Sequence, residues 1–310
     1  MFDWSWADAY QRHGYEYYPK WINAIPFTPC FGPRWLQDSG ADINNAEVLA
    51  AINAMTSSKQ ISSWHCLFPP EAQAQALEAE SMHLRLGCQF HWFNRHYAHF
   101  DDFLATMQSR KRKNIVKERR QVREQSIHFK TLEGSMLTEA HMALFYQLYC
   151  TTYLKRSGHK GYLTELFFRQ VRAHMAEQLL LILAYKINSD GLEVPVAGSL
   201  YLRDSTTLYG RYWGCFDEYN FLHFETCYYQ GIDYAIANGL QRFDGGAQGE
   251  HKLARGFEPQ ITYSTHYLYQ SQFHHAIGNF VREEAEAIKA YALQAAQSLP
   301  FKSSEANGGE

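Results

Sequence analysis

The sequence predicts a mixed α/β (α+β) protein with two domains. The chain has 310 residues, of which 46% are hydrophobic, so it is long and apolar enough to bury two cores. Three short apolar runs between residues 179 and 216 are typical of successive buried strands. Residues 224–236 instead repeat their apolar side chains at helical spacing. Helices packed on a sheet would bury both patterns.

Residues 1–97 are expected to form an incomplete first domain. Phe2, Trp4 and Trp6 alternate with polar residues, which predicts a half-buried strand at the start of the chain. A domain seldom opens on a core strand, so we interpret the chain as truncated, with a genuine short form as the alternative. The unpartnered strand edge would also favour a homodimer. The other elements expected here are helices at 47–59 and 71–80 and strands at 63–68 and 83–93.

A basic, helical connector is expected at residues 98–125. Its cations could bind the phosphates of a cofactor or of tRNA through several point charges. A solvated helix face without a ligand is the alternative, and the sequence leaves both open. The candidate phosphate-binding residues are Arg110, Arg112, Lys113 and Lys117.

A nearly complete second domain is expected at residues 126–272. Thr164 is a candidate N-cap, and Gly239 suits a helix C-terminus because glycine adopts a left-handed conformation without steric cost. An amphipathic helix at 273–301 and a disordered tail at 302–310 would follow. The elements expected within the domain are helices at 138–156, 164–178 and 223–238 and strands at 127–132, 179–187, 194–203, 208–216, 240–243 and 262–269.

Glycines and titratable side chains meet in a loop after the strand expected at 240–243. Gly245, Gly246 and Gly249 allow sharp bends or the close approach of a ligand. Lys252 and Arg255 follow them and could hold a phosphate or a developing negative charge. A surface loop with salt bridges is the alternative. Loops at strand ends are where α/β folds place their chemistry.

The candidate acid–base residues lie in the same part of the chain. Glu225, near a helix start, would stay ionised and could accept a proton, although first-turn carboxylates also occur for helix stability alone. His251 titrates near neutrality, as does His223, and Glu250 is a further catalytic candidate. A structural histidine is the alternative for both. Tyrosines such as Tyr228 could donate a proton or could simply fill the core.

Several classes of protein are disfavoured by composition. A net charge of −3 argues against a general nucleic-acid coat, so a polyanion site would have to be local. The six cysteines lack zinc spacing and suit a reduced, cytoplasmic protein, with no metal expected. No apolar run approaches the ~20 residues of a membrane helix. Neither a Walker loop nor a nucleophile elbow is present.

Two longer motifs and one short motif resemble the FemAB-like group of N-acyltransferases, which have the GNAT acyltransferase fold. Residues 249–257 resemble that group's basic Lys-x-x-x-Gly-Phe loop, and residues 110–120 resemble its basic interdomain helix. Residues 2–10 resemble a segment normally found well inside the first domain. The resemblance implies tandem GNAT-like domains, the first incomplete, joined by a basic helical connector.

The resemblance also implies an N-acyltransferase. An amine of a small molecule or a cell-wall (peptidoglycan) precursor would attack an activated acyl carbonyl directly. Residues 217–222 are acidic and lack the glycines of the coenzyme-A loop, so no tightly bound cofactor is expected. The donor remains open between aminoacyl-tRNA and an acyl thioester. A non-catalytic protein that recognises RNA or a cell-wall precursor is the alternative. Asp3 and Asp8 could face an acceptor groove, or could be capping or surface residues.

Overall fold

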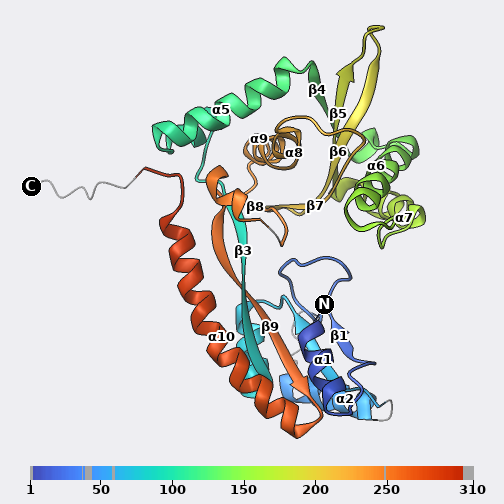
Figure 1. The fold of residues 1–310 in the computed structure, drawn as a ribbon, viewed down its shortest axis with the longest axis vertical. Coiled ribbons are helices and arrows are strands. Elements are labelled where there is room, and N and C mark those ends of the chain that lie inside the picture. Colours follow the sequence, from blue (N-terminus) through green and yellow to red (C-terminus); the bar gives the residue numbers. More distant parts are fainter. Residues whose placement is uncertain (1–2, 37, 39–43, 58–59, 248, 303–310) are drawn as a thin grey trace, which may run out of the picture. The chain divides into compact units, whose positions relative to one another are not determined.

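The computed structural model describes residues 3–36, 38, 44–57, 60–247 and 249–302 (Figure 1). It divides into two compact units. Unit 1 comprises the chain up to Gln89 together with Pro259–Gln297, and unit 2 comprises Phe90–Glu258 and the chain from Ser298 onward. The units are therefore discontinuous in sequence and do not follow the predicted boundaries. Phe2 and residues 303–310 of the predicted tail lie outside the described residues.

Unit 1 is built on four strands and was predicted in most of its elements. The strand order is β1-β2-β9-β3, with β1 parallel to β2 and β2 antiparallel to β9. Residues 259–268 were expected in the second domain, but they belong here because β9 pairs along the full length of β2. The elements are β1 (Trp21–Asn23), α2 (Asn45–Ser57), β2 (Ser63–Leu67), α3 (Glu71–Ala79), β3 (His83–Phe93), β9 (Glu258–Leu268) and α10 (Ser271–Gln297).

The predicted opening strand is wrong. Trp4–Arg12 forms a helix, α1. Trp6 and Tyr10, four residues apart, share the buried face of this helix, whereas the side chain of Trp4 is 68% exposed. Tyr10 stacks on Phe273 of α10, with the ring centroids 3.9 Å apart. Alternation over five residues is too short to distinguish a strand from one helical turn with a single buried tryptophan.

Unit 2 contains the predicted run of strands and the two predicted helices that precede it. The strand order is β8-β7-β6-β5-β4, and all neighbours are antiparallel except β7 and β8, which are parallel. Thr164 caps α7 as predicted, because its hydroxyl accepts from the Phe167 N–H at 3.3 Å. The elements are β4 (Ile127–Glu133), α6 (Glu139–Ser157), α7 (Glu165–Met175), β5 (Leu179–Ile187), β6 (Glu193–Arg203), β7 (Thr207–Cys215) and β8 (Arg242–Asp244).

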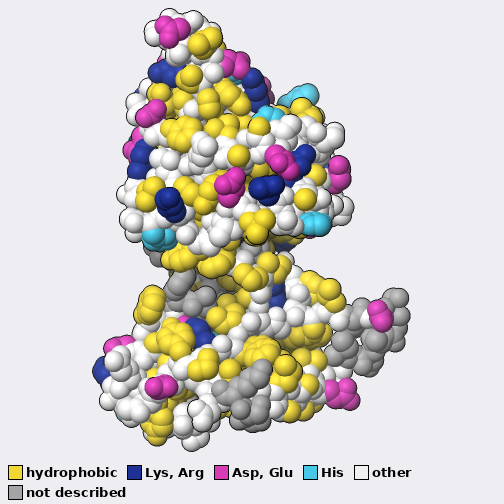
Figure 2. Space-filling view, turned by 90° about the vertical axis from the view of Figure 1, so that its right-hand side faces the viewer, with side chains coloured by type: hydrophobic (Ala, Val, Ile, Leu, Met, Phe, Trp, Pro, Cys, Tyr) yellow, Lys and Arg dark blue, Asp and Glu magenta, His cyan; other side chains and the backbone are white. Residues whose placement is uncertain are grey.

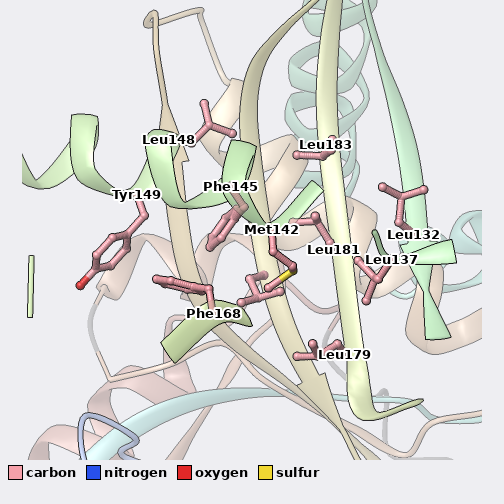
Figure 3. Packing of buried hydrophobic residues seen from close by; sticks show 11 residues of the cluster. Leu132, Leu137, Met142, Phe145, Leu148, Tyr149, Phe168, Leu179, Leu181 and Leu183 are labelled. Atoms are coloured by element: carbon pink, nitrogen blue, oxygen red, sulfur yellow. The ribbon is translucent and has the colours of Figure 1, made fainter. Parts of the chain in front are cut away.

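The core of unit 2 is centred on β5, which is apolar on both faces. Leu179, Leu181 and Leu183 project toward Met142 and Phe145 of α6 (Figure 3). The intervening residues of β5 are also fully buried. A strand covered on both faces reads as a continuous apolar run rather than an alternating one, which is why this strand was predictable.

The helix predicted at 223–238 has an unexpected centre. It consists of α8 (Leu222–Phe224), a five-residue π-helical segment (Glu225–Tyr229) and α9 (Gln230–Ala237). Gly239 follows with φ +64°, as expected for a helix C-terminus. Single π turns inside α-helices are rare and are frequent at functional sites.

The predicted connector forms two helices that belong to unit 2. They are α4 (Phe100–Ala105) and α5 (Ser109–Glu124). Ile115 and Val122, one heptad apart, bury the inner side of α5. Among the described residues, no helix combines the length and apolar character needed to cross a bilayer.

We predict that Gly214→Ala destabilises the protein by at least about 2 kcal/mol. A Cβ at this position of β7 would lie 2.2 Å from the backbone carbonyl carbon of Leu148, which α6 holds in place. Urea denaturation measures the loss. Gly32→Ala is the control, because its nearest contact would be an ordinary van der Waals distance of 3.6 Å, to Nη2 of Arg34. Equal stability of the two variants would contradict the close packing of α6 on β7.

Candidate active site

The glycine-rich loop of unit 2 is more ordered and more buried than predicted. Glu250–Arg255 forms a 3-10 helical turn, and Lys252 and Arg255 are only 1% and 6% exposed, so the surface-loop interpretation is wrong. The Nζ of Lys252 donates to the carbonyl of Gly246 at 2.6 Å. Burial lowers the pKa of Lys252 to about 8, although Asp244 partly opposes the shift. The buried Lys252 side chain therefore anchors the glycine loop from inside.

Arg255 fastens the same turn to α5. Its Nη2 pairs with the carboxylate of Glu118 at 2.9 and 3.0 Å, and its Nη1 donates to the carbonyl of His251 at 2.8 Å. The guanidinium also lies over the ring of Phe224, 3.4 Å from its centroid. Its buried Nε has no hydrogen-bond partner among the described residues. The positive charge of Arg255 is thus already compensated in part, and one N–H remains available.

Glu225 occupies a second buried ion pair rather than an open position. Its carboxylate accepts hydrogen bonds from Nε and Nη2 of Arg119 at 3.0–3.2 Å and from the side-chain amide of Gln230 at 2.8 Å. Arg119 also pairs with Asp233 at 2.5 Å. Burial raises the pKa of Glu225, and the Arg119 charge opposes that rise. Glu225 lies in the π-helical segment, and its geometry is that of a residue that joins this segment to α5.

His251 lies beside a tyrosine and a second histidine. Its Nε2 lies 2.9 Å from the hydroxyl of Tyr228, and its ring lies 6.1 Å from that of His223. Burial, and then the charges of Arg255 and Lys252, lower the pKa of His251. His223 is lowered further, to about 4, by burial, by His251 and by nearby cations that include Arg156. Both imidazoles are therefore neutral at pH 7 and able to accept a proton.

The charges around these histidines favour a negatively charged ligand. Arg156, Lys252 and Arg255 all act on His223, and each of them disfavours a further positive charge there. Glu250, the remaining catalytic candidate, lies next to His251 but is exposed. We call His223, Tyr228, His251, Lys252 and Arg255 the histidine site. It brings a proton acceptor and anion-binding groups together, as acyl transfer requires.

The predicted phosphate-binding residues of α5 divide between its outer and inner sides. Arg110, Lys113 and Lys117 are exposed at spacings of three and four residues, whereas Arg112 is half-buried. None of the three exposed residues has an acidic partner in the described part of the chain. Figure 2 shows a different face, where Lys and Arg side chains are scattered singly among acidic and hydrophobic ones. The outer stripe of α5 remains a candidate surface for phosphates.

Three functional contacts were missed by the sequence analysis. Glu118 and Arg119 hold the site from α5, and Arg156 adds its charge from the end of α6. A signal for the first two existed, because they lie between the apolar residues Ile115 and Val122 on the inner side of the helix. A charge in such a stripe indicates a buried ion pair. No comparable signal identifies Arg156. Among the described residues, no three His, Cys, Asp or Glu side chains are grouped to hold a metal.

The sequence matches the profile of the FemAB-like family, described as peptidoglycan biosynthesis/recognition, over residues 1–303. The chain belongs to the FemAB-like family. A search of curated proteins finds no significant match. The family description connects the chain with the biosynthesis or recognition of peptidoglycan.

Solved structures share the fold of this FemAB-like chain at low identity. The structure of FemX has a TM-score of 0.51 at 12% identity and covers 82% of this chain and 85% of its own. The structure of L-PGS from Bacillus licheniformis has a TM-score of 0.52 at 9% identity and covers 83% of this chain and 79% of its own. A third structure has a TM-score of 0.53 at 8% identity and covers 78% of this chain and 78% of its own. It is the C-terminal domain (DUF2156) of a putative lysylphosphatidylglycerol synthetase from Agrobacterium fabrum. The predicted fold class is confirmed.

We predict that Arg119→Met costs about 3 kcal/mol of unfolding free energy at pH 7, because it leaves the Glu225 carboxylate buried without its counter-charge. Without Arg119, the pKa of Glu225 should rise further above its ordinary value of 4.5. A raised folded-state pKa means that protonation favours the folded protein, so the deficit should shrink as the pH falls from 7 toward 4.5.

Urea denaturation of the wild type and the variant at several pH values measures this deficit. Arg120→Met is the matched control, because Arg120 is the next residue of α5 and its pair with Glu124 is 60% and 61% exposed. A deficit independent of pH, or one equal to that of the control, would show that the ion pair does not hold Glu225.

Proposed function

We propose that this protein is an N-acyltransferase whose chemistry takes place at the histidine site. The observation that carries the proposal is the neutral imidazole of His251, bonded to Tyr228 and next to the buried cations Lys252 and Arg255. Membership of a family of peptidoglycan biosynthesis/recognition supports an amine of a peptidoglycan precursor as the acceptor.

The reaction would proceed by direct attack. The acceptor nitrogen forms a bond to the acyl carbon, and the bond from that carbon to the donor oxygen or sulfur breaks. His251 takes the proton that the nitrogen must lose, and this proton is then available to the departing group. The free Nε–H of Arg255 and the charge of Lys252 suit the negative charge that develops on the carbonyl oxygen.

The preferred donor is an aminoacyl-tRNA. The segment before α8 contains Asp217 and Glu218 and no glycine, which disfavours the pyrophosphate of coenzyme A. The outer stripe of α5 offers cations at helical spacing that have no acidic partner among the described residues, and such a stripe can follow a phosphate backbone. An acyl thioester remains the second candidate donor.

A recognition protein is the competing function. The family description includes recognition, and a protein that only binds a precursor would need the cations but not a proton acceptor. Turnover, rather than binding, separates the two functions.

We predict that His251→Gln lowers turnover by about a hundredfold or more and changes donor affinity little, because glutamine can bond Tyr228 but cannot take a proton. The wild type is incubated with charged tRNAs or acyl thioesters and with precursor peptides that carry a free amine, and the product is detected by mass spectrometry. Glu250→Gln is the control, since it removes an exposed neighbouring charge. Binding without turnover in the wild type would favour recognition, and an active His251→Gln variant would exclude His251 as the base.

We predict that the α5 stripe gives tRNA binding a steep salt dependence. Lys113→Gln combined with Lys117→Gln should reduce the slope of log affinity against log salt by about 1.4, at about 0.7 for each contact with a single strand. Lys160→Gln combined with Arg169→Gln removes two exposed cations of unit 2 that lie outside the stripe and should leave the slope unchanged. Equal slopes for both double variants would show that α5 is a solvated face.

A further inference from the structure

A chain of hydrogen bonds crosses the interior of unit 1, outside the histidine site. Ser264 Oγ lies 2.9 Å from His266 Nε2, and His266 Nδ1 lies 2.8 Å from His65 Nδ1. His65 Nε2 lies 3.1 Å from the hydroxyl of Tyr17, which donates to the carboxylate of Asp3. Lys20 forms an ion pair with the other oxygen of Asp3. Asp3 occupies the N-cap position of α1, but its side chain makes no capping hydrogen bond, and it is buried rather than a surface residue.

The ion pair at one end sets the direction of every bond in the chain. Asp3, paired with Lys20, accepts the proton of Tyr17, so the Tyr17 oxygen is an acceptor, to which His65 Nε2–H can donate. His65 Nδ1 then carries no proton and must accept a hydrogen bond from His266 Nδ1–H. His266 Nε2 therefore carries no proton either. Ser63 Oγ lies 2.8 Å from His65 Nε2 and shares the proton that His65 Nε2 donates to Tyr17. Ser264 therefore donates its hydroxyl proton to His266.

The middle of the hydrogen-bond chain is shielded from solvent, whereas its Ser264 end is not. His65 and His266 are fully buried, and the ring of Trp6 covers them at centroid distances of 6.0 and 5.0 Å. Ser264 is only partly buried. Burial lowers the pKa of His65 to about 3 and that of His266 well below its ordinary value, so neither ring holds an extra proton. A proton accepted from Ser264 must therefore pass along the chain to Asp3.

We propose that Ser264 is an activated nucleophile that accepts an acyl group from an activated carboxylic ester. Its Oγ forms a bond to the acyl carbon, the ester C–O bond breaks, and the products are an acyl-serine and an alcohol. The serine proton enters at His266 Nε2, and each member passes one proton on until Asp3 is neutral. As the ester C–O bond breaks, the reverse shift returns a proton from His266 Nε2 to the leaving oxygen, which departs as the alcohol, and Asp3 is again the partner of Lys20. A serine held by a histidine that a third group orients is the usual pattern of such nucleophiles. The inference does not rest on the function proposed for unit 2.

An alkyl fluorophosphonate tests the proposal in the full-length protein without any donor or acceptor. The serine oxygen displaces fluoride from phosphorus, and peptide mapping by mass spectrometry locates the adduct. We expect labelling at Ser264, its loss in Ser264→Ala, and at least a tenfold slower rate in Tyr17→Phe. His251→Gln should label normally, which separates this site from the histidine site.

Tyr10→Phe is the matched control for Tyr17→Phe. The Tyr10 ring packs on Tyr17 with centroids 5.1 Å apart, and its buried hydroxyl has no hydrogen-bond partner among the described residues, so its removal breaks no link. Equal labelling rates in these two variants, or no labelling of Ser264 in the wild type, would overturn the proposal.

Nitrogen-15 NMR gives a second reading that needs no variant. Protons on His266 Nδ1 and His65 Nε2 would support the proposed directions of the hydrogen bonds, and a proton on His266 Nε2 would contradict them.

Discussion

The pairing of buried charges between α5 and its neighbours determines the geometry of unit 2. Arg119 binds Glu225 and Asp233, and Glu118 binds Arg255. A buried charge that lost its partner would cost several kcal/mol, so these contacts admit few alternative positions. They join α5 to a π-helical segment and to a 3-10 turn, and the paired residues are more than 100 positions apart in the sequence. The positions of His251 and Lys252 follow from this network.

The π-helical segment distributes its side chains to different partners. Glu225 bonds Arg119, Tyr229 donates to Glu118, and Tyr228 meets His251. A π turn carries one extra residue compared with an α turn, so consecutive side chains leave the helix in directions that a regular helix does not offer. The segment thus supplies a structural ion pair and a partner for a neutral histidine within five residues.

Two polar networks in the molecule solve the same burial problem in different ways. In unit 2, opposite charges are brought together in pairs. In unit 1, only the end of the chain is ionic, and the histidines in its middle remain neutral because burial penalises their charged form. The first arrangement holds elements in place, whereas the second provides a path along which protons can move. Since one fold supports many chemistries, these side chains, and not the shared fold, decide the activity.

The sequence by itself determined the local elements with a strong pattern. The continuous apolar run of β5, the cap at Thr164 and the glycine that ends α9 depend on neighbours a few residues away, and all were predictable. The family was recognisable from motifs in α5 and in the turn at residues 249–257. Only the tertiary structure decided that Trp4–Arg12 is a helix, because α10 supplies the surface that buries Trp6 and Tyr10. It also decided that Glu225 is paired and that Lys252 is buried. The burial of Lys252 and the pairing of Glu225 depend on residues distant in sequence, and no pattern around either residue carries that information.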